Sequence, residues 1–270
     1  MLQVRRGERL SSFAWGVLYI SVANLASIAA FRLASGRWDW RGLLELSSAA
    51  VGNALIAVMI TVVGLYVLAA LFGIITSLQL LEISRPTHPL LRQLLLKAPG
   101  TYHHTLIVAN MSERAAEAIG ADALLTRVGA YYHDVGKTIR PYFFVENRTE
   151  GMDPHARLDP YTSAQIIVTH VKDGMDLARK YRLPQRIINF IPEHQGTMLV
   201  SYFYHQATQQ ATSPDDVDKT QFQYPGPRPQ SRETAITMLA DSAEATVRAR
   251  RPATIEELER IVAESIQSRL

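Results

Sequence analysis

Two long stretches without a charged residue occupy the first third of this chain. One runs over residues 13–31 and the other over residues 46–81. At about 1.5 Å per residue, a helix over either stretch is long enough to cross roughly 30 Å of hydrocarbon. We therefore predict two transmembrane helices, at about residues 13–31 and 50–72, within a membrane segment that covers residues 1–81.

The residues around these stretches favour membrane spans over a cleaved signal peptide. The first stretch ends at Phe31-Arg32-Leu33, which lacks the small residues of a cleavage site, and a second apolar stretch follows. Trp38 and Trp40 lie in the connector, where aromatic side chains suit a membrane interface. The chain is thus expected to be a multi-pass protein of the cell membrane whose direct partner is the lipid bilayer.

Basic residues indicate the orientation of the spans. They precede the first span at Arg5, Arg6 and Arg9, and follow the second at Arg85, Arg92 and Lys97. By the positive-inside rule both ends lie in the cytoplasm, and residues 82–270 form a cytoplasmic domain. The connector carries three further arginines that argue against this orientation, namely Arg32, Arg37 and Arg41.

Composition excludes several classes of function. The chain has 28 Lys and Arg against 25 Asp and Glu, a net charge of +3, which is too small to predict binding to a nucleic-acid polymer. It has no cysteine, so disulfides and thiolate metal sites are excluded. Any bound metal must be held by His, Asp, Glu or Gln.

Residues 82–270 predict an all-α fold, because they show no alternating strand pattern and several helix signals. Gly120 is expected to end one helix, and Ser231 and Thr254 to begin two others. The helices are expected over residues 102–119, 121–132, 161–181, 184–194, 231–249 and from 254 onward. Two polar stretches are expected to be loops, residues 138–160 over a site and residues 206–230.

A histidine followed by an aspartate, His133-Asp134, ends one of these predicted helices. Imidazole and carboxylate are ligands that Mg, Mn, Fe and Zn accept. The pair alone is weak evidence, but other such side chains lie in predicted helices that can direct them to a common centre, namely His104, His170, His194 and Asp241. These residues together predict a metal site.

Three of these candidates also have a purely structural interpretation. Asp241 lies among apolar neighbours, so it needs either a metal or an ion pair with Arg127 or Arg186. His170 fits a hydrogen-bonded core histidine, and His194 fits a positive charge at a helix C-terminus.

Other histidines and basic residues give weaker signals. His103 and His104 point about 100° apart on a helix, so only one of them can face the site. Lys137 either takes part in the site or is a solvated lysine at a helix end, and Arg140 and Arg232 are weaker candidates of the same kind. Three histidines are expected at the surface or in loops, namely His88, His155 and His205.

Six short motifs together resemble the HD phosphohydrolase domain of the seven-transmembrane HD receptors. They are PGTYHH at 99–104, HDVGK at 133–137, FFVEN at 143–147, HVKDG at 170–174, HQGT at 194–197 and YPGPRP at 224–229. Residues 72–91 also resemble the membrane exit of that family. The resemblance covers most of residues 50–265 and implies an all-α chain with two transmembrane helices followed by a helical HD bundle.

The resemblance implies a metal-dependent phosphodiesterase that hydrolyses cyclic di-AMP to the linear dinucleotide pApA. It assigns a first metal to His104, His133, Asp134 and Asp241, and a second to His170 and His194, with Asp134 bridging the two. His133, Asp134 and Lys137 would be catalytic, and Lys137, Arg140 and Arg232 would bind substrate. Two divalent ions are implied, with Fe or Mn favoured over Zn or Co.

Two departures from the family pattern qualify this expectation. Gln195 stands where the family has a second histidine, so the second metal is expected to bind less tightly. The chain is also short, and we expect it to be a C-terminal part of a larger receptor. The alternatives are an HD hydrolase for another cyclic dinucleotide or nucleotide, and a nucleotide sensor without turnover. The sequence leaves open whether the chain forms a homo-oligomer.

Overall fold

The computed structural model describes the chain except residues 1, 37–38, 72–74, 149–152 and 270. Its contacts divide the chain into two compact units, Met1–Ile74 and Ile75–Leu270. The predicted boundary after residue 81 lies seven residues later, inside the helix α3 (Ser77–Ile83). Leu80 and Ile83 of this helix are buried in the core of the second unit, so α3 belongs to that unit and the boundary falls before it.

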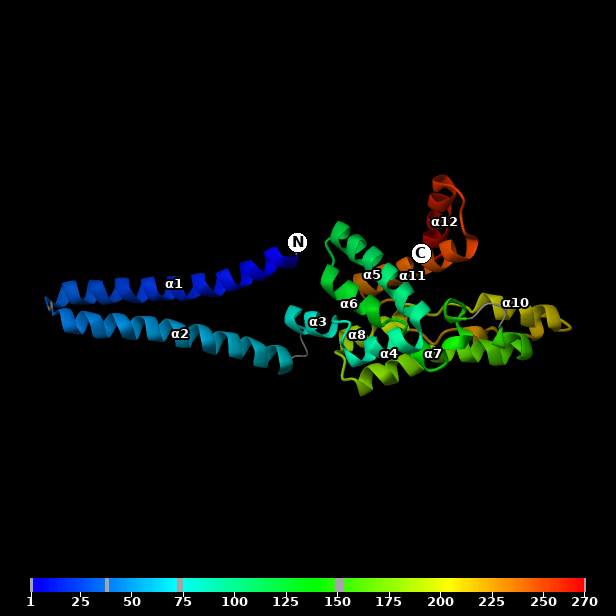
Figure 1. Ribbon diagram of the computed structural model, residues 1–270, viewed down its shortest axis with the longest axis horizontal. Coiled ribbons are helices and arrows are strands. Elements are labelled where there is room, and N and C mark those ends of the chain that lie inside the picture. The colour runs from blue at the N-terminus through cyan, green and yellow to red at the C-terminus, as the bar shows by residue number, and fades with distance from the viewer. Residues whose placement is uncertain (1, 37–38, 72–74, 149–152, 270) are drawn as a thin grey trace. The chain divides into compact units, whose positions relative to one another are not determined.

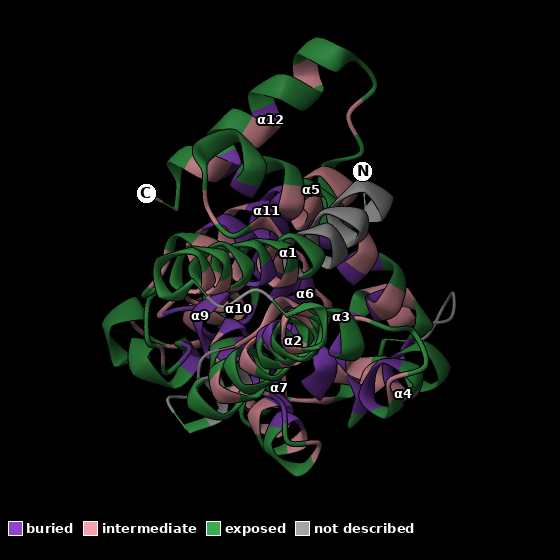
Figure 2. Cartoon of the chain, turned by 90° about the vertical axis from the view of Figure 1, so that its left-hand side faces the viewer, coloured by how far each residue is buried: buried purple, intermediate pink, exposed green. Residues whose placement is uncertain are grey.

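The first unit consists of two long helices, α1 (Leu2–Ser35) and α2 (Trp40–Leu71), which lie side by side in opposite directions (Figure 1). Ala14–Ser35 and Trp40–Leu65 are long and apolar enough to cross a membrane. Most of their side chains are exposed (Figure 2), which is consistent with the predicted transmembrane helices. Trp40 is exposed at the start of α2, whereas Trp38 and the last residue of the predicted second span lie outside the described residues.

The second unit is built from helices, which confirms the predicted fold class. They are α3, α4 (Pro89–Lys97), α5 (Pro99–Ile119), α6 (Ala123–Tyr132), α7 (Pro160–Lys180), α8 (Gln185–Ile188), α9 (Phe190–Glu193), α10 (Ser201–Gln210), α11 (Arg232–Arg250) and α12 (Ile255–Gln267). Short 3-10 turns join them: η1 (Val135–Thr138), η2 (Pro141–Phe143), η3 (Val145–Asn147), η4 (Pro154–Arg157), η5 (Pro214–Asp216) and η6 (Lys219–Phe222). In the described part of the chain, extended pairing is limited to a single bridge between Leu199 and Gln223.

Local signals account for most helix boundaries. Asp122, Ser231 and Thr254 each accept a backbone N–H of the first turn of α6, α11 and α12. Gly120 ends α5 with a φ of 69°, a left-handed conformation that glycine adopts without steric cost. α5 begins three residues earlier than predicted, because Pro99 is tolerated at the first helical position.

One predicted loop was wrong in part. Residues 206–230 were expected to be irregular, but α10 extends to Gln210. Phe203 and Ala207, one helical turn apart, bury an apolar face of α10, and α10 packs on α7 and η6. The Gln-rich and Thr-rich composition hid this short apolar face.

The core of the second unit brings η1 directly against α7. Buried residues of α4, α6, α8 and α9 form the main apolar cluster, including Leu94, Leu125 and Phe190. Gly136 in η1 lies so close to the carbonyl oxygen of His170 that a Cβ would collide with it. Only glycine therefore allows the His-Asp turn to reach the middle of α7.

Candidate metal centre

Two groups of buried side chains in the second unit present ligand atoms within 4.8 Å of one another. The first group is His104, His133, Asp134 and Asp241, and the second is Asp134, His170 and His194. They come from α5, the end of α6, the turn before η1, α7, the end of α9 and α11. The structure thus brings together all six predicted metal ligands.

Asp134 belongs to both groups and offers one carboxylate oxygen to each. Its Oδ2 lies 3.3 Å from His133 Nε2 and 3.7 Å from His104 Nε2. Its Oδ1 lies 3.4 Å from His170 Nε2 and 3.5 Å from His194 Nε2. This is the placement of a carboxylate that can bridge two cations.

Three of the histidines are oriented by the backbone in the same way. The Nδ1 atoms of His133, His170 and His194 each lie 2.6 Å from a carbonyl oxygen three residues earlier in the chain. Because a carbonyl oxygen only accepts, each Nδ1 carries a proton and donates it, and this fixes the ring so that Nε2 faces Asp134.

These inward-facing atoms have no hydrogen-bond partner. The Nε2 atoms of the three histidines and Oδ1 of Asp134 are buried and unpaired. Buried polar atoms without partners are costly, and imidazole nitrogens that face a carboxylate are the donor set of a divalent cation. The side chains of the two groups are therefore suited to bind a divalent metal ion.

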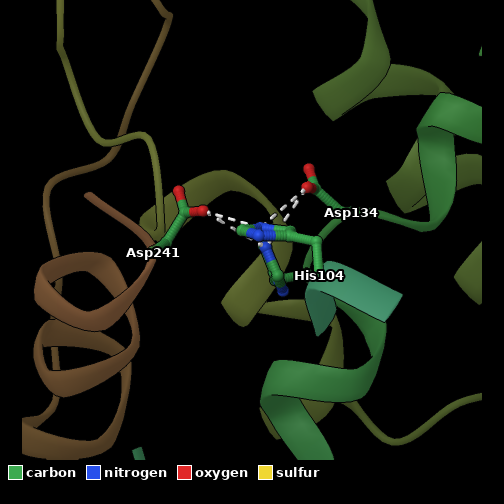
Figure 3. A group of neighbouring side chains, drawn as sticks. His104, Asp134 and Asp241 are labelled. Atoms are coloured by element: carbon green, nitrogen blue, oxygen red, sulfur yellow. Dashed lines mark hydrogen bonds and ion pairs between the residues drawn. The ribbon is translucent and has the colours of Figure 1, made fainter. Parts of the chain in front are cut away.

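His104 lies between the carboxylates of Asp134 and Asp241 (Figure 3). Its Nε2 lies 2.9 Å from Asp241 Oδ1, and its Nδ1 lies 2.6 Å from Oε2 of a third carboxylate, that of Glu244. A carboxylate behind a ligating histidine fixes its ring and raises its basicity. The neighbouring His103 is exposed, so the structure selects His104 for the site. Asp241 does not pair with Arg127, which bonds Glu113 instead.

Burial and charge set the protonation states. Burial lowers the pKa of His170 to about 4, so its ring is neutral at pH 7. Burial opposes ionisation of Asp134, but Lys137 and His133 hold its pKa well below the usual range. Burial also lowers the pKa of His133, yet Asp134 and Asp241 raise it to about 10. A cation at this position must displace that proton, so binding releases it.

Lys137 is not the solvated lysine of the alternative interpretation. Its Nζ lies 2.7 Å from Asp134 Oδ2 and 2.9 Å from Glu146 Oε1. The two other predicted substrate-binding cations lie outside the two groups. Arg140 pairs with Asp173 and borders a surface hollow beside Tyr161. Arg232 is exposed at the first position of α11.

Some structural roles were missed in the sequence. Glu244 supports His104, and a signal existed, because Glu244 lies three residues after Asp241 on the same helix face. Glu146, which contacts Lys137, and Glu193, which accepts a hydrogen bond from Thr234, had no comparable signal in the sequence. His155, expected at the surface or in a loop, lies in η4 but is buried, because its ring packs on Phe143 and Phe203.

Comparison with known proteins identifies the family of this chain. The HD domain family matches residues 101–246, and the chain belongs to that family. This confirms the resemblance of its HD motifs.

The chain is also similar to particular proteins. Cyclic-di-AMP phosphodiesterase PgpH of Bacillus subtilis is 46% identical over 199 residues, which cover 74% of this chain and 28% of that protein. PgpH of Listeria monocytogenes is 46% identical over 199 residues, 74% of this chain and 27% of that protein. A crystal structure of the L. monocytogenes PgpH HD domain in complex with cyclic-di-AMP has a TM-score of 0.65 and 45% identity, covering 69% of this chain and 86% of that one. The chain spans about a quarter of the length of these curated relatives.

Proposed function

We propose that this chain is a membrane-anchored, metal-dependent phosphodiesterase that hydrolyses cyclic di-AMP to linear pApA. The observation that carries the proposal is Asp134, which presents one oxygen to each of two groups of inward-facing histidine nitrogens. The substrate is supported by the PgpH relatives and by the similar HD domain solved with cyclic-di-AMP.

In this proposal the first group holds one divalent cation and the second group holds another, with Asp134 shared. Ligation by nitrogen and oxygen without thiolate favours Fe or Mn. Divalent cations bound at such a site acidify a water molecule and offset charge on a phosphate.

The chain's own residues then have defined tasks. The backbone carbonyls accept from Nδ1 of three histidines and so direct Nε2 inward, and the low pKa of Asp134 keeps its carboxylate ionised. Lys137 contributes an ammonium beside Asp134 for a non-bridging phosphate oxygen, and Arg140 and Arg232 are proposed to contact the substrate further out. Hydrolysis adds one water across one phosphodiester bond: phosphorus gains an oxygen, and the 3′ oxygen leaves with a proton.

The activity test uses the full chain in detergent, loaded anaerobically with Mn or Fe. We expect hydrolysis of cyclic di-AMP to pApA in preference to cyclic di-GMP, and loss of that activity in Asp134→Ala. Faster hydrolysis of another cyclic dinucleotide or nucleotide would move the proposal to that substrate. Binding without turnover, in protein with fewer than two metals per chain, would contradict the enzyme and indicate a sensor.

We further propose that α1 and α2 cross the cell membrane and that the HD unit lies in the cytoplasm. The absence of cysteine makes this testable, because a single introduced thiol reports its own side of the membrane. Ser35→Cys, exposed at the end of α1, should react in intact cells with a membrane-impermeant thiol reagent. Thr212→Cys, exposed in the HD unit, should react only after permeabilisation. The reverse pattern would contradict the orientation.

A further inference from the structure

Lys137 places its ammonium between two carboxylates. Nζ lies 2.7 Å from Asp134 Oδ2 and 2.9 Å from Glu146 Oε1, and 5.1 Å from the centre of the Phe144 ring. Its side chain is 12% exposed, against 1% for Asp134 and 6% for Glu146. An ammonium has three N–H donors, so both carboxylates can be satisfied at once.

A cation bound in the first group would compete with this arrangement. Oδ2 of Asp134 faces His133 and His104, so it is the oxygen available to a cation in the first group. An ammonium in contact with that oxygen competes for its lone pairs and is repelled by a nearby divalent cation. A cation in the first group therefore weakens the contact between Lys137 and Asp134, and Glu146 is the second carboxylate that can hold the ammonium.

Glu146 lies in η3 and is held by hydrogen bonds to the first turn of α5. The hydroxyl of Thr101 donates to Glu146 Oε1 at 3.0 Å, and Asn147 Nδ2 donates to the Thr101 hydroxyl at 2.7 Å. The backbone N–H of Thr101 donates to Asn147 Oδ1 at 3.1 Å. Thr101 lies one turn before His104, so the carboxylate that holds Lys137 is fixed to the helix that carries a proposed ligand.

We propose that Glu146 is a positioning residue that draws Lys137 away from Asp134 when divalent cations bind. Asp134 is then free to bridge, and the ammonium stays at the edge of the site, where a phosphate oxygen can reach it. This inference rests on the proposed metal-dependent function and assigns Glu146 a task within it. Without Glu146, Lys137 keeps Asp134 as its partner and competes with the metal.

The test measures Co²⁺ and Mn²⁺ affinity of the full chain by calorimetry and by the visible absorption of bound Co²⁺. Glu146→Gln removes the charge with little change in shape, and Lys137→Met removes the ammonium. We expect Glu146→Gln to weaken cation affinity by about tenfold or more, as for other supporting residues of metal ligands. In the Lys137→Met background, the same Glu146→Gln change should have little effect, because no ammonium remains to compete.

The double variant separates this role from a purely structural one. A substitution that merely loosened the fold would weaken affinity equally with or without Lys137, and that result would overturn the proposal. So would unchanged affinity in Glu146→Gln while the parent chain binds metal and hydrolyses cyclic di-AMP; in that case the proposed function stands. A parent chain that binds no cation would overturn both.

Two controls sharpen the measurement. Thr101→Val keeps the shape of the side chain and removes the hydroxyl that holds Glu146, so a smaller loss in the same direction is expected. Glu264→Gln removes an exposed carboxylate that pairs with Arg250 and Arg260, and it should leave cation affinity unchanged.

Discussion

The buried carboxylate of Glu193 accepts a hydrogen bond from the hydroxyl of Thr234 at 2.7 Å. The same oxygen accepts the backbone N–H of Gln230, also at 2.7 Å. Glu193 directly precedes His194, and Thr234 lies in the first turn of α11, the helix that carries Asp241. Glu193 thus links the segment that carries His194, in the second group, to the helix that carries Asp241, in the first. Its carboxylate lies at the N-terminus of α11, where a negative charge is favoured.

We expect Glu193→Ala to destabilise the HD unit by about 2 kcal/mol or more, because it leaves a buried N–H and a hydroxyl without their charged acceptor. Chemical denaturation of the metal-free chain, followed by circular dichroism, measures the free energy of unfolding. Thr234→Val removes only one of the two bonds and should cost less. Equal stability of Glu193→Ala and the parent chain would contradict the joining role.

Removal of single ligands should affect the two groups unequally. Asp134→Asn changes the carboxylate shared by both groups and should lower the metal content by up to two ions per chain. Asp241→Asn should affect only the first group, and His170→Gln only the second. Metal analysis after dialysis against a fixed free Mn²⁺ concentration gives the content, and an equal loss in all three variants would contradict the shared role of Asp134.

Gln195→His should tighten binding at the second group. Gln195 follows His194, and the amide oxygen of a glutamine is a weaker ligand than an imidazole nitrogen. We expect the weaker of two Mn²⁺ affinities to increase by about tenfold, comparable to the effect of other changes around a metal site. Calorimetric titration resolves the two affinities. An increase in the tighter one instead would mean that residue 195 serves the first group.

Acid should destabilise the fold in part through His155. Burial lowers the pKa of this histidine, so the unfolded chain takes up the proton first as the pH falls. The stability contribution is therefore complete above the ordinary histidine pKa of about 6.5 and is lost as the pH falls below it. Between about pH 7.5 and pH 5.5, His155→Phe should lose less stability than the parent chain. His88, whose pKa burial also lowers, remains in both proteins and does not affect the difference.

Glu244→Ala should reduce cation affinity about ten- to a hundredfold, because His104 loses the carboxylate that fixes its ring. Glu244→Gln should lose less, since an amide oxygen can still accept from Nδ1. Mn²⁺ titration at constant pH measures both. Arg248→Gln removes a cation 3.7 Å from Glu244 and serves as the matched control, with little expected change.

The local features of the fold could be predicted from the sequence, and the long-range partners could not. Caps such as Asp122 and Ser231 act within a few residues, so they mark helix starts directly. The six candidate ligands could be predicted because His-Asp and its companions form recognisable motifs. Thr101 and Glu146 are 45 residues apart, and Glu193 and Thr234 are 41 apart, so their pairing follows from helix packing that no local pattern encodes.

The shared orientation of three histidines has a consequence for how the centre tolerates evolutionary change. His133, His170 and His194 are aligned by carbonyl groups of their own helical turns, which every residue type supplies. Drift in the neighbouring side chains therefore leaves their alignment intact. His104 depends on the single side chain of Glu244, so this corner of the centre is the one where random substitution most readily erodes metal binding.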